Sequence, residues 1–143
     1  MEFDKDFLGK LFEQAVTNPR LRQNFDLRTS PADTSQRMLN ALLPGTKVPI
    51  HRHENTTETV ICLVGKLEEI IYEEVNEYIY EATSCCDDVI RQKSFKEVSR
   101  QILSPAEGKF GIQIPAGAWH TINVIEPSVI FEVKDGAYRG DDR

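Results

Sequence analysis

The chain contains three histidines, and their positions are the strongest chemical signal in the sequence. His51 and His53 are separated by a single residue, whereas His120 stands far along the chain, after a turn sequence that begins at Pro115. Residues two apart point to the same face of a β-strand but diverge around a helix. A strand is therefore the conformation in which both imidazoles of the pair reach one point.

Glu58 is the candidate that completes this set. It follows the histidine pair across a short polar turn at residues 55–57 and begins the next apolar segment, so a hairpin would turn its carboxylate back toward the imidazoles. Three imidazoles and a carboxylate suit iron, manganese, nickel, cobalt, copper or zinc better than calcium or magnesium, which prefer oxygen ligands. We predict one divalent transition metal with open coordination positions for a small-molecule ligand. Its protein ligands would be His51, His53, Glu58 and His120.

The elements that position these residues are expected to be mostly β-strands. Residues 4–16 carry apolar side chains at helical spacing and predict one short helix, whereas residues 18–35 show no period and are expected to be a surface connection. From residue 36 onward, short runs rich in valine, isoleucine, threonine and aromatic residues alternate with glycine and proline turns. This pattern is typical of a sandwich or closed barrel.

Residues 66–80 fit this interpretation least well, because their glutamates and apolar spacing favour a helix as readily as a strand. We predict strands here because the rest of the chain is β. The acidic run of Glu68, Glu69, Glu73, Glu74, Glu77 and Glu81 is interpreted as a solvated face rather than a cation site.

The chain length fits one domain. Residues 1–35 would pack as a helix and connection on an all-β barrel of residues 36–143, with an acidic insertion near residues 73–96.

Composition excludes several classes of partner. The net charge is −6, which argues against general binding to nucleic acid or to anionic membrane surfaces. No apolar run is long enough to span a membrane, and the first residues lack a secretory pattern, so we expect a cytoplasmic protein. Three cysteines, two of them adjacent, do not make a disulfide framework. Cys62 is expected in the core, and Cys85 and Cys86 as reduced thiols.

Three further side chains are candidates for ligand contact. Arg37 offers a rigid fork for a carboxylate or phosphate, with an ion pair to a glutamate as the equal alternative. Tyr72 is a candidate hydroxyl donor to the pocket, although packing is the commoner role for a tyrosine. Trp119 neighbours His120 and is expected to point the opposite way in a strand, which favours packing over stacking on a ligand.

Two sets of residues have the spacing of known sequence motifs. One consists of Gly45, His51, His53, Glu58 and Gly65, and the other of Pro115, Gly117 and His120. In this spacing the chain resembles the cupin superfamily, whose first motif is matched at every position. Asn123 stands one residue earlier than the asparagine that ends the second motif. The resemblance implies a double-stranded β-helix, or jelly-roll, barrel that holds one metal ion.

A narrower resemblance extends over most of the chain. It is carried by residues 18–22, 36–42, 44–46, 51–53, 114–121 and 131–134, which look like the WbuC family of cupin-fold metalloproteins. That family is associated with bacterial surface-polysaccharide gene clusters, and small cupins often form homodimers. Two functions are implied. One is a metal-dependent enzyme, an oxygenase or isomerase, acting on a small carbohydrate-like or carboxylated metabolite. The other is a non-catalytic metal-containing module that binds a sugar or metabolite.

Overall fold

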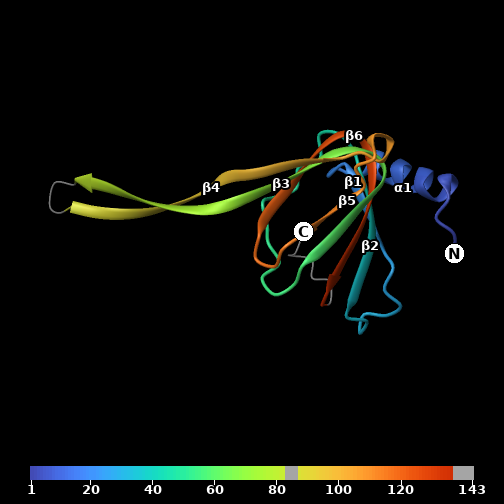
Figure 1. Ribbon diagram of the computed structural model, residues 1–143, viewed down its shortest axis with the longest axis horizontal. Helices are drawn as coiled ribbons and strands as arrows, with labels where there is room; N and C mark the ends of the chain where they lie inside the picture. The colour runs from blue at the N-terminus through green and yellow to red at the C-terminus, as the bar shows by residue number, and fades with distance from the viewer. Residues whose placement is uncertain (83–86, 137–143) are drawn as a thin grey trace.

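The computed structural model describes residues 1–82 and 87–136, and it confirms an all-β fold with one short N-terminal α-helix (Figure 1). All strand pairings are antiparallel, in the order β1-β2-β6-β3-β4, with β5 paired to β3. The elements are α1 (Lys5–Thr17), β1 (Arg22–Asp26), β2 (Ser35–Leu42), β3 (Glu58–Ala82), β4 (Asp87–Leu103), the 3-10 helix η1 (Pro105–Glu107), β5 (Gly111–Ile114) and β6 (Trp119–Asp135). In the described part of the chain, no helix is long and apolar enough to cross a membrane.

Helix α1 forms where the apolar spacing predicts it. The Asp4 carboxylate accepts a hydrogen bond from the backbone N–H of Phe7 at 2.9 Å, which satisfies one of the donors left open at a helix start. Leu11 and Ala15 of this helix are buried. They belong to an apolar cluster on the outer face of the sheet together with Leu39, Ala41 and Val129.

Strand β1 corrects the expectation that residues 18–35 have no regular structure. Residues Arg22–Asp26 pair with β2, so that Arg22 lies opposite Leu42 and Asn24 lies opposite Asn40. No alternation of apolar residues marks this segment in the sequence. Its strand conformation comes from the free edge of β2, with the Arg22 guanidinium donating to the carbonyl of Lys47 at 3.0 Å.

The interior of the barrel contains a second apolar cluster, and side-chain alternation assigns each strand residue to one of the two clusters. The interior cluster consists of Leu42, Val48, Val60, Cys62, Leu67, Leu103, Ile114, Ile122, Val124 and Ile130. On β2, Leu42 therefore faces the interior, whereas Leu39 and Ala41 face α1. The predicted core position of Cys62 is confirmed, and burial raises the pKa of its thiol to about 11.

Gly65 lies at a close approach between the backbones of β3 and β6. Its φ is +96°, and a Cβ at this position would overlap the carbonyl oxygen of Pro127 and the side chain of Ser128. The register between the two strands shifts on both sides of Gly65. Only glycine combines this backbone conformation with so close an approach, so the barrel curvature depends on it.

The strand prediction for residues 66–80 is confirmed, because they form part of β3. Figure 1 shows β3 and β4 as a long hairpin whose distal part extends away from the rest of the molecule. Pairing of β3 with β6 ends at Tyr72, whereas pairing with β4 continues to Ala82 opposite Asp87. We call the part of the hairpin beyond Tyr72 and before Glu97 the arm. Cys85 and Cys86 lie outside the described residues.

Candidate metal centre

The structure brings the four predicted metal ligands together. One nitrogen from each of three histidines and one carboxylate oxygen lie within 4.8 Å of one another, in a group formed by His51, His53, Glu58 and His120. The imidazole ring centroids of His51 and His120 are 4.2 Å apart, and those of His53 and His120 are 5.6 Å apart. Residues distant in sequence thus converge on one point.

The backbone that holds the histidine pair differs from the strand expected for it. His51 forms a single bridge with His120, in which each backbone N–H donates to the other residue's carbonyl, at 3.0 and 2.8 Å. His53 lies beyond this bridge, and its carbonyl accepts from the N–H of Gly117 at 2.7 Å. The pair therefore stands on an extended segment that is tied to the Pro115–Gly117 turn and to the start of β6.

Backbone carbonyls orient two of the imidazoles. His51 Nδ1 lies 2.8 Å from the carbonyl oxygen of Pro49, and His120 Nδ1 lies 2.9 Å from that of Ala118. Because a carbonyl oxygen only accepts hydrogen bonds, Nδ1 carries the proton in each ring. The Nε2 lone pairs are then available for a metal, and a carbonyl on the other ring nitrogen is the usual support of a metal-binding histidine.

Glu58 is the first residue of β3 and only 2% of its surface is exposed. Its Oε2 lies 2.7 Å from Nε2 of His53 and 3.6 Å from Nε2 of His120. Neither pair of atoms forms a hydrogen bond. Two lone-pair donors and a carboxylate oxygen this close, in a buried position, are stabilised by a cation between them. The residues present therefore fit a transition-metal ion.

Trp119 lies on the other side of β6 from His120, as strand alternation predicts. Its indole packs against Phe95 at 4.9 Å between ring centroids, and the charged groups of Arg52 and Lys93 lie 4.6 and 4.7 Å from the ring. These contacts tie the segment between the two ligand histidines, the base of the arm and β6 together. Trp119 thus supports the site from outside.

Arg37 and Tyr72, the two candidates for substrate contact, are not part of the four-residue group. The Arg37 guanidinium pairs with Asp33 at 3.0 Å and donates to the carbonyl of Ser35 at 2.8 Å. The pKa of the Asp33 carboxyl is lowered by backbone hydrogen bonds from Ser35 and Thr29 and by this arginine. Tyr72 lies at the base of the arm, with its ring edge toward Phe95.

Sequence reasoning missed several buried polar residues on the strands. Glu69, interpreted as part of a solvated acidic face, is only 2% exposed and lies opposite Ile122. This is a correction, and its cause is the strand alternation that turns Leu67 and Glu69 to the same interior face. The other buried polar strand residues include Gln36, Asn40, Glu132 and Lys134. The sequence signal for them is an even spacing, four residues between Gln36 and Asn40 and two between Glu132 and Lys134, which places each pair on one face of its strand.

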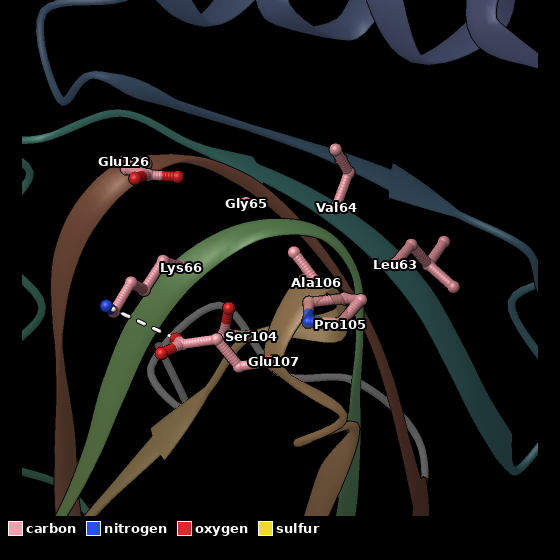
Figure 2. Close-up of a pocket in the computed structure, with 9 residues that line it drawn as sticks. All are labelled: Leu63, Val64, Gly65, Lys66, Ser104, Pro105, Ala106, Glu107 and Glu126. Atoms are coloured by element: carbon pink, nitrogen blue, oxygen red, sulfur yellow. Dashed lines mark ion pairs between the residues drawn. The ribbon is translucent and has the colours of Figure 1, made fainter.

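A hollow of about 330 Å³ on the surface contains none of the four metal-centre residues (Figure 2). Its rim is crossed by an ion pair between Lys66 and Glu107 at 3.2 Å, drawn as a dashed line in Figure 2. The lining residues come from the Gly65 segment of β3, from Ser104 with η1, and from Glu126 of β6. None of the four predicted metal ligands lines this hollow, although Glu58 and His120 lie on two of the same strands, so the hollow is separate from the candidate metal centre.

The model of a family described as Domain of unknown function (DUF6016) matches residues 3–83. A search of curated protein sequences finds no significant match. The narrower resemblance to the WbuC family stays a prediction.

Similar solved structures share the fold at low sequence identity. KdgF from Halomonas sp. has 15% identity and a TM-score of 0.53, with 87% of each chain covered. The capsular polysaccharide assembling protein CapF from Staphylococcus aureus has 18% identity and a TM-score of 0.53, covering 87% of this chain and 31% of CapF. YcfD, a ribosomal oxygenase from Escherichia coli in complex with cobalt and succinic acid, has 17% identity and a TM-score of 0.51. The match covers 75% of this chain and 24% of YcfD. The chain thus spans about a quarter to a third of two of these proteins, and the likeness establishes the fold.

Proposed function

The chain belongs to the family described as Domain of unknown function (DUF6016), and we propose that it is a metal-dependent enzyme acting on a small carbohydrate-like or carboxylated metabolite. The observation that carries this proposal is the convergence of His51, His53, Glu58 and His120 on one buried point. A metal ion bound there would supply a Lewis acid or redox centre with coordination positions left over for substrate.

The chain's own residues have defined parts in this proposal. The carbonyls of Pro49 and Ala118 hold His51 and His120 in the tautomer that ligates through Nε2. Glu58 supplies negative charge, which lowers the net charge of a bound divalent cation, and a carboxylate freed from the metal would accept a proton from substrate. Oxygenase and isomerase reactions are the classes that this arrangement suits best.

Metal content is the first test. Protein purified without added metal should contain close to one transition-metal ion per chain by elemental analysis. His51→Ala and His120→Ala should each lose most of it, because each removes one of four ligands. Glu54→Gln is the matched control, since Glu54 is an exposed carboxylate in the same segment and pairs with Arg52. Full occupancy in both histidine variants would refute the ligand assignment.

The choice between an enzyme and a binding module needs a second measurement. Metal-loaded protein is incubated with uronic and aldonic acids, and proton NMR spectra are followed over time. An enzyme produces new signals that grow with time and that are absent with Glu58→Gln. Reversible shifts of the substrate signals without any product would favour the non-catalytic sugar- or metabolite-binding module.

We also propose a role in surface-polysaccharide metabolism and the formation of a homodimer. A role in surface-polysaccharide metabolism is supported by the WbuC resemblance and by the structural neighbour CapF, which is a capsular polysaccharide assembling protein. Homodimer formation is supported by the arm, which exposes 71% of Tyr78. Light scattering after size exclusion should give twice the chain mass, and a monomer mass at micromolar concentration would exclude a stable dimer.

A further inference from the structure

A second group of polar side chains lies inside the barrel, separate from the metal ligands. It consists of Asn24 on β1 and Gln36 and Asn40 on β2, and we call it the inner amide group. Asn40 is opposite Asn24 on one side and opposite Ile130 on the other. Since Ile130 belongs to the interior apolar cluster, alternation turns the Asn40 side chain toward the interior rather than toward α1.

Four polar atoms of these amides are buried without hydrogen-bond partners in the described part of the chain, although Asn24 as a whole is only half-buried. Asn40 is 0% exposed, and neither its Nδ2 nor its Oδ1 has a hydrogen-bond partner. Oε1 of Gln36, which is 3% exposed, and Oδ1 of Asn24 also lack a partner. Buried polar atoms are nearly always hydrogen-bonded, and leaving them unpaired destabilises the fold. Three such residues on two neighbouring strands indicate a place where something else supplies the hydrogen bonds.

Two buried charged residues connect the inner amide group to the metal centre. Lys134 lies opposite Gln36, and Glu132 lies opposite Met38 on β2 and Val60 on β3. Glu58 is two residues from Val60 on the same strand, so its side chain shares the face of Val60 and Glu132. Directly opposed residues have Cβ atoms about 5 Å apart. The polar row therefore continues from the amides to a metal ligand.

The interior is thus divided into two ends of different chemistry. Beyond Leu42 and Ile130, the inward positions are filled by the apolar cluster that includes Leu67 and Leu103. Near Gln36, amides and charged groups share the inward positions with Met38 and Val60. A barrel built only for stability would continue the apolar packing, because replacing a buried unpaired amide by an apolar side chain of the same shape costs little or stabilises.

We propose that the inner amide group binds the hydroxyl groups of a small polyhydroxylated carboxylate whose other end reaches the metal centre. A primary amide offers both a donor and an acceptor, which matches the paired donor and acceptor character of neighbouring hydroxyls. A metal ion held by the four predicted ligands would take the carboxylate. This inference deepens the proposed function and rests on it for the metal end only, because the amides are independent of the metal ligands.

The test uses two probes of equal chain length. D-Gluconate and hexanoate are both six-carbon carboxylates, but only gluconate carries hydroxyl groups along its chain. Isothermal titration calorimetry of metal-loaded protein should detect gluconate and should show at least tenfold weaker binding of hexanoate. Asn40→Leu should weaken gluconate binding at least tenfold and leave metal content unchanged. Gln92→Leu, which replaces an exposed amide on the arm, is the matched control and should bind gluconate as the unchanged protein does.

Thermal unfolding of the same variants separates recognition from structure. Asn40→Leu should unfold at the same temperature as the unchanged protein or higher, because it removes unpaired polar atoms from the interior. A lower unfolding temperature with unchanged gluconate binding would show that buried water satisfies the amides, and it would overturn the inference. If Asn40→Leu does not fold, Gln36→Met, whose side chain has nearly the same shape, takes its place with the same expected results.

The outcomes also separate this inference from the proposed function. Protein that binds one metal ion but binds gluconate and hexanoate equally, or binds neither, refutes the inner amide group as a hydroxyl site. Protein that binds no metal but binds gluconate through Asn40 refutes the metal-dependent enzyme and leaves the inner amide group supported.

Discussion

The barrel and the arm are built partly from the same strand, yet different forces hold them. From Leu67 to Tyr72, β3 lies between β4 and β6, and residues such as Leu67 point into the apolar interior. Beyond Tyr72 it pairs with β4 alone, and Figure 1 shows the arm leaving the body of the molecule. Tyr78 is 71% exposed there, and Glu74 pairs with Lys93 at 3.3 Å. Burial stabilises the barrel, whereas cross-strand contacts stabilise the arm.

This difference has a consequence for function. The metal centre and the inner amide group both lie in the barrel, where side chains are held by packing on several sides. A two-stranded hairpin in water is only marginally stable by itself. Sites that need fixed geometry are therefore expected in the barrel, whereas the exposed arm is expected to offer surface for contact with a partner.

The largest expected effect on stability comes from a cavity in the barrel core. Leu67→Ala should lower the free energy of unfolding by about 2–5 kcal/mol, because Leu67 is fully buried in the interior cluster. The matched comparison is Val98→Ala on β4, where the side chain is 52% exposed. This substitution should change the free energy of unfolding by less than about 0.5 kcal/mol. Chemical denaturation measures both. Equal losses of stability in the two variants would show that burial in the interior cluster does not set the cost of a substitution.

A smaller loss of stability is expected from a substitution at the close approach between β3 and β6. Gly65→Ala should destabilise the protein by about 1–3 kcal/mol, because its Cβ would overlap Pro127 and its φ is positive. Gly9→Ala should have the opposite sign and stabilise by about 1 kcal/mol, since Gly9 lies within α1 and a Cβ there meets nothing within 4 Å. A neutral Gly65→Ala in thermal unfolding would contradict the close approach.

Burial of Cys62 should make the free energy of unfolding depend on pH at alkaline pH. Its pKa is raised from 9.0 to about 11 by burial, so the neutral thiol is favoured in the folded state. The resulting stability is fully present below pH 9 and is lost as the pH rises toward 11. Cys62→Ala should lack this part of the decline. In a Cys85→Ser, Cys86→Ser background, iodoacetamide at pH 8 should label Cys62 only after unfolding, and rapid labelling of folded protein would contradict its burial.

The smallest effect on stability is expected on the arm. Tyr78→Ser should change the free energy of unfolding of the monomer by less than about 0.5 kcal/mol, because the ring is mostly exposed. If the arm contacts a second copy, the same substitution should weaken self-association measured by sedimentation equilibrium. A loss of stability as large as that of Leu67→Ala, with no change in association, would show that the arm belongs to the folding core.

Much of the metal centre and of the barrel follows from local sequence. The spacing of His51, His53 and Glu58 requires only a strand-like segment and a turn, and α1 follows from its apolar spacing and the Asp4 cap. Alternation and turn residues similarly predict an all-β barrel. These features are visible in the sequence because each depends on neighbours a few residues away.

Other features depend on contacts between distant segments. Strand β1 forms because β2 offers an open edge, and residues 66–80 are strand rather than helix because β4 and β6 pair with them. The burial of Glu69 and Asn40 depends on which face of each strand closes onto the interior, which alternation alone does not reveal. The sequence by itself determined which four residues come together and the class of fold. The tertiary structure decided which polar residues are enclosed with the metal centre, because enclosure is a property of the closed barrel and not of any one strand.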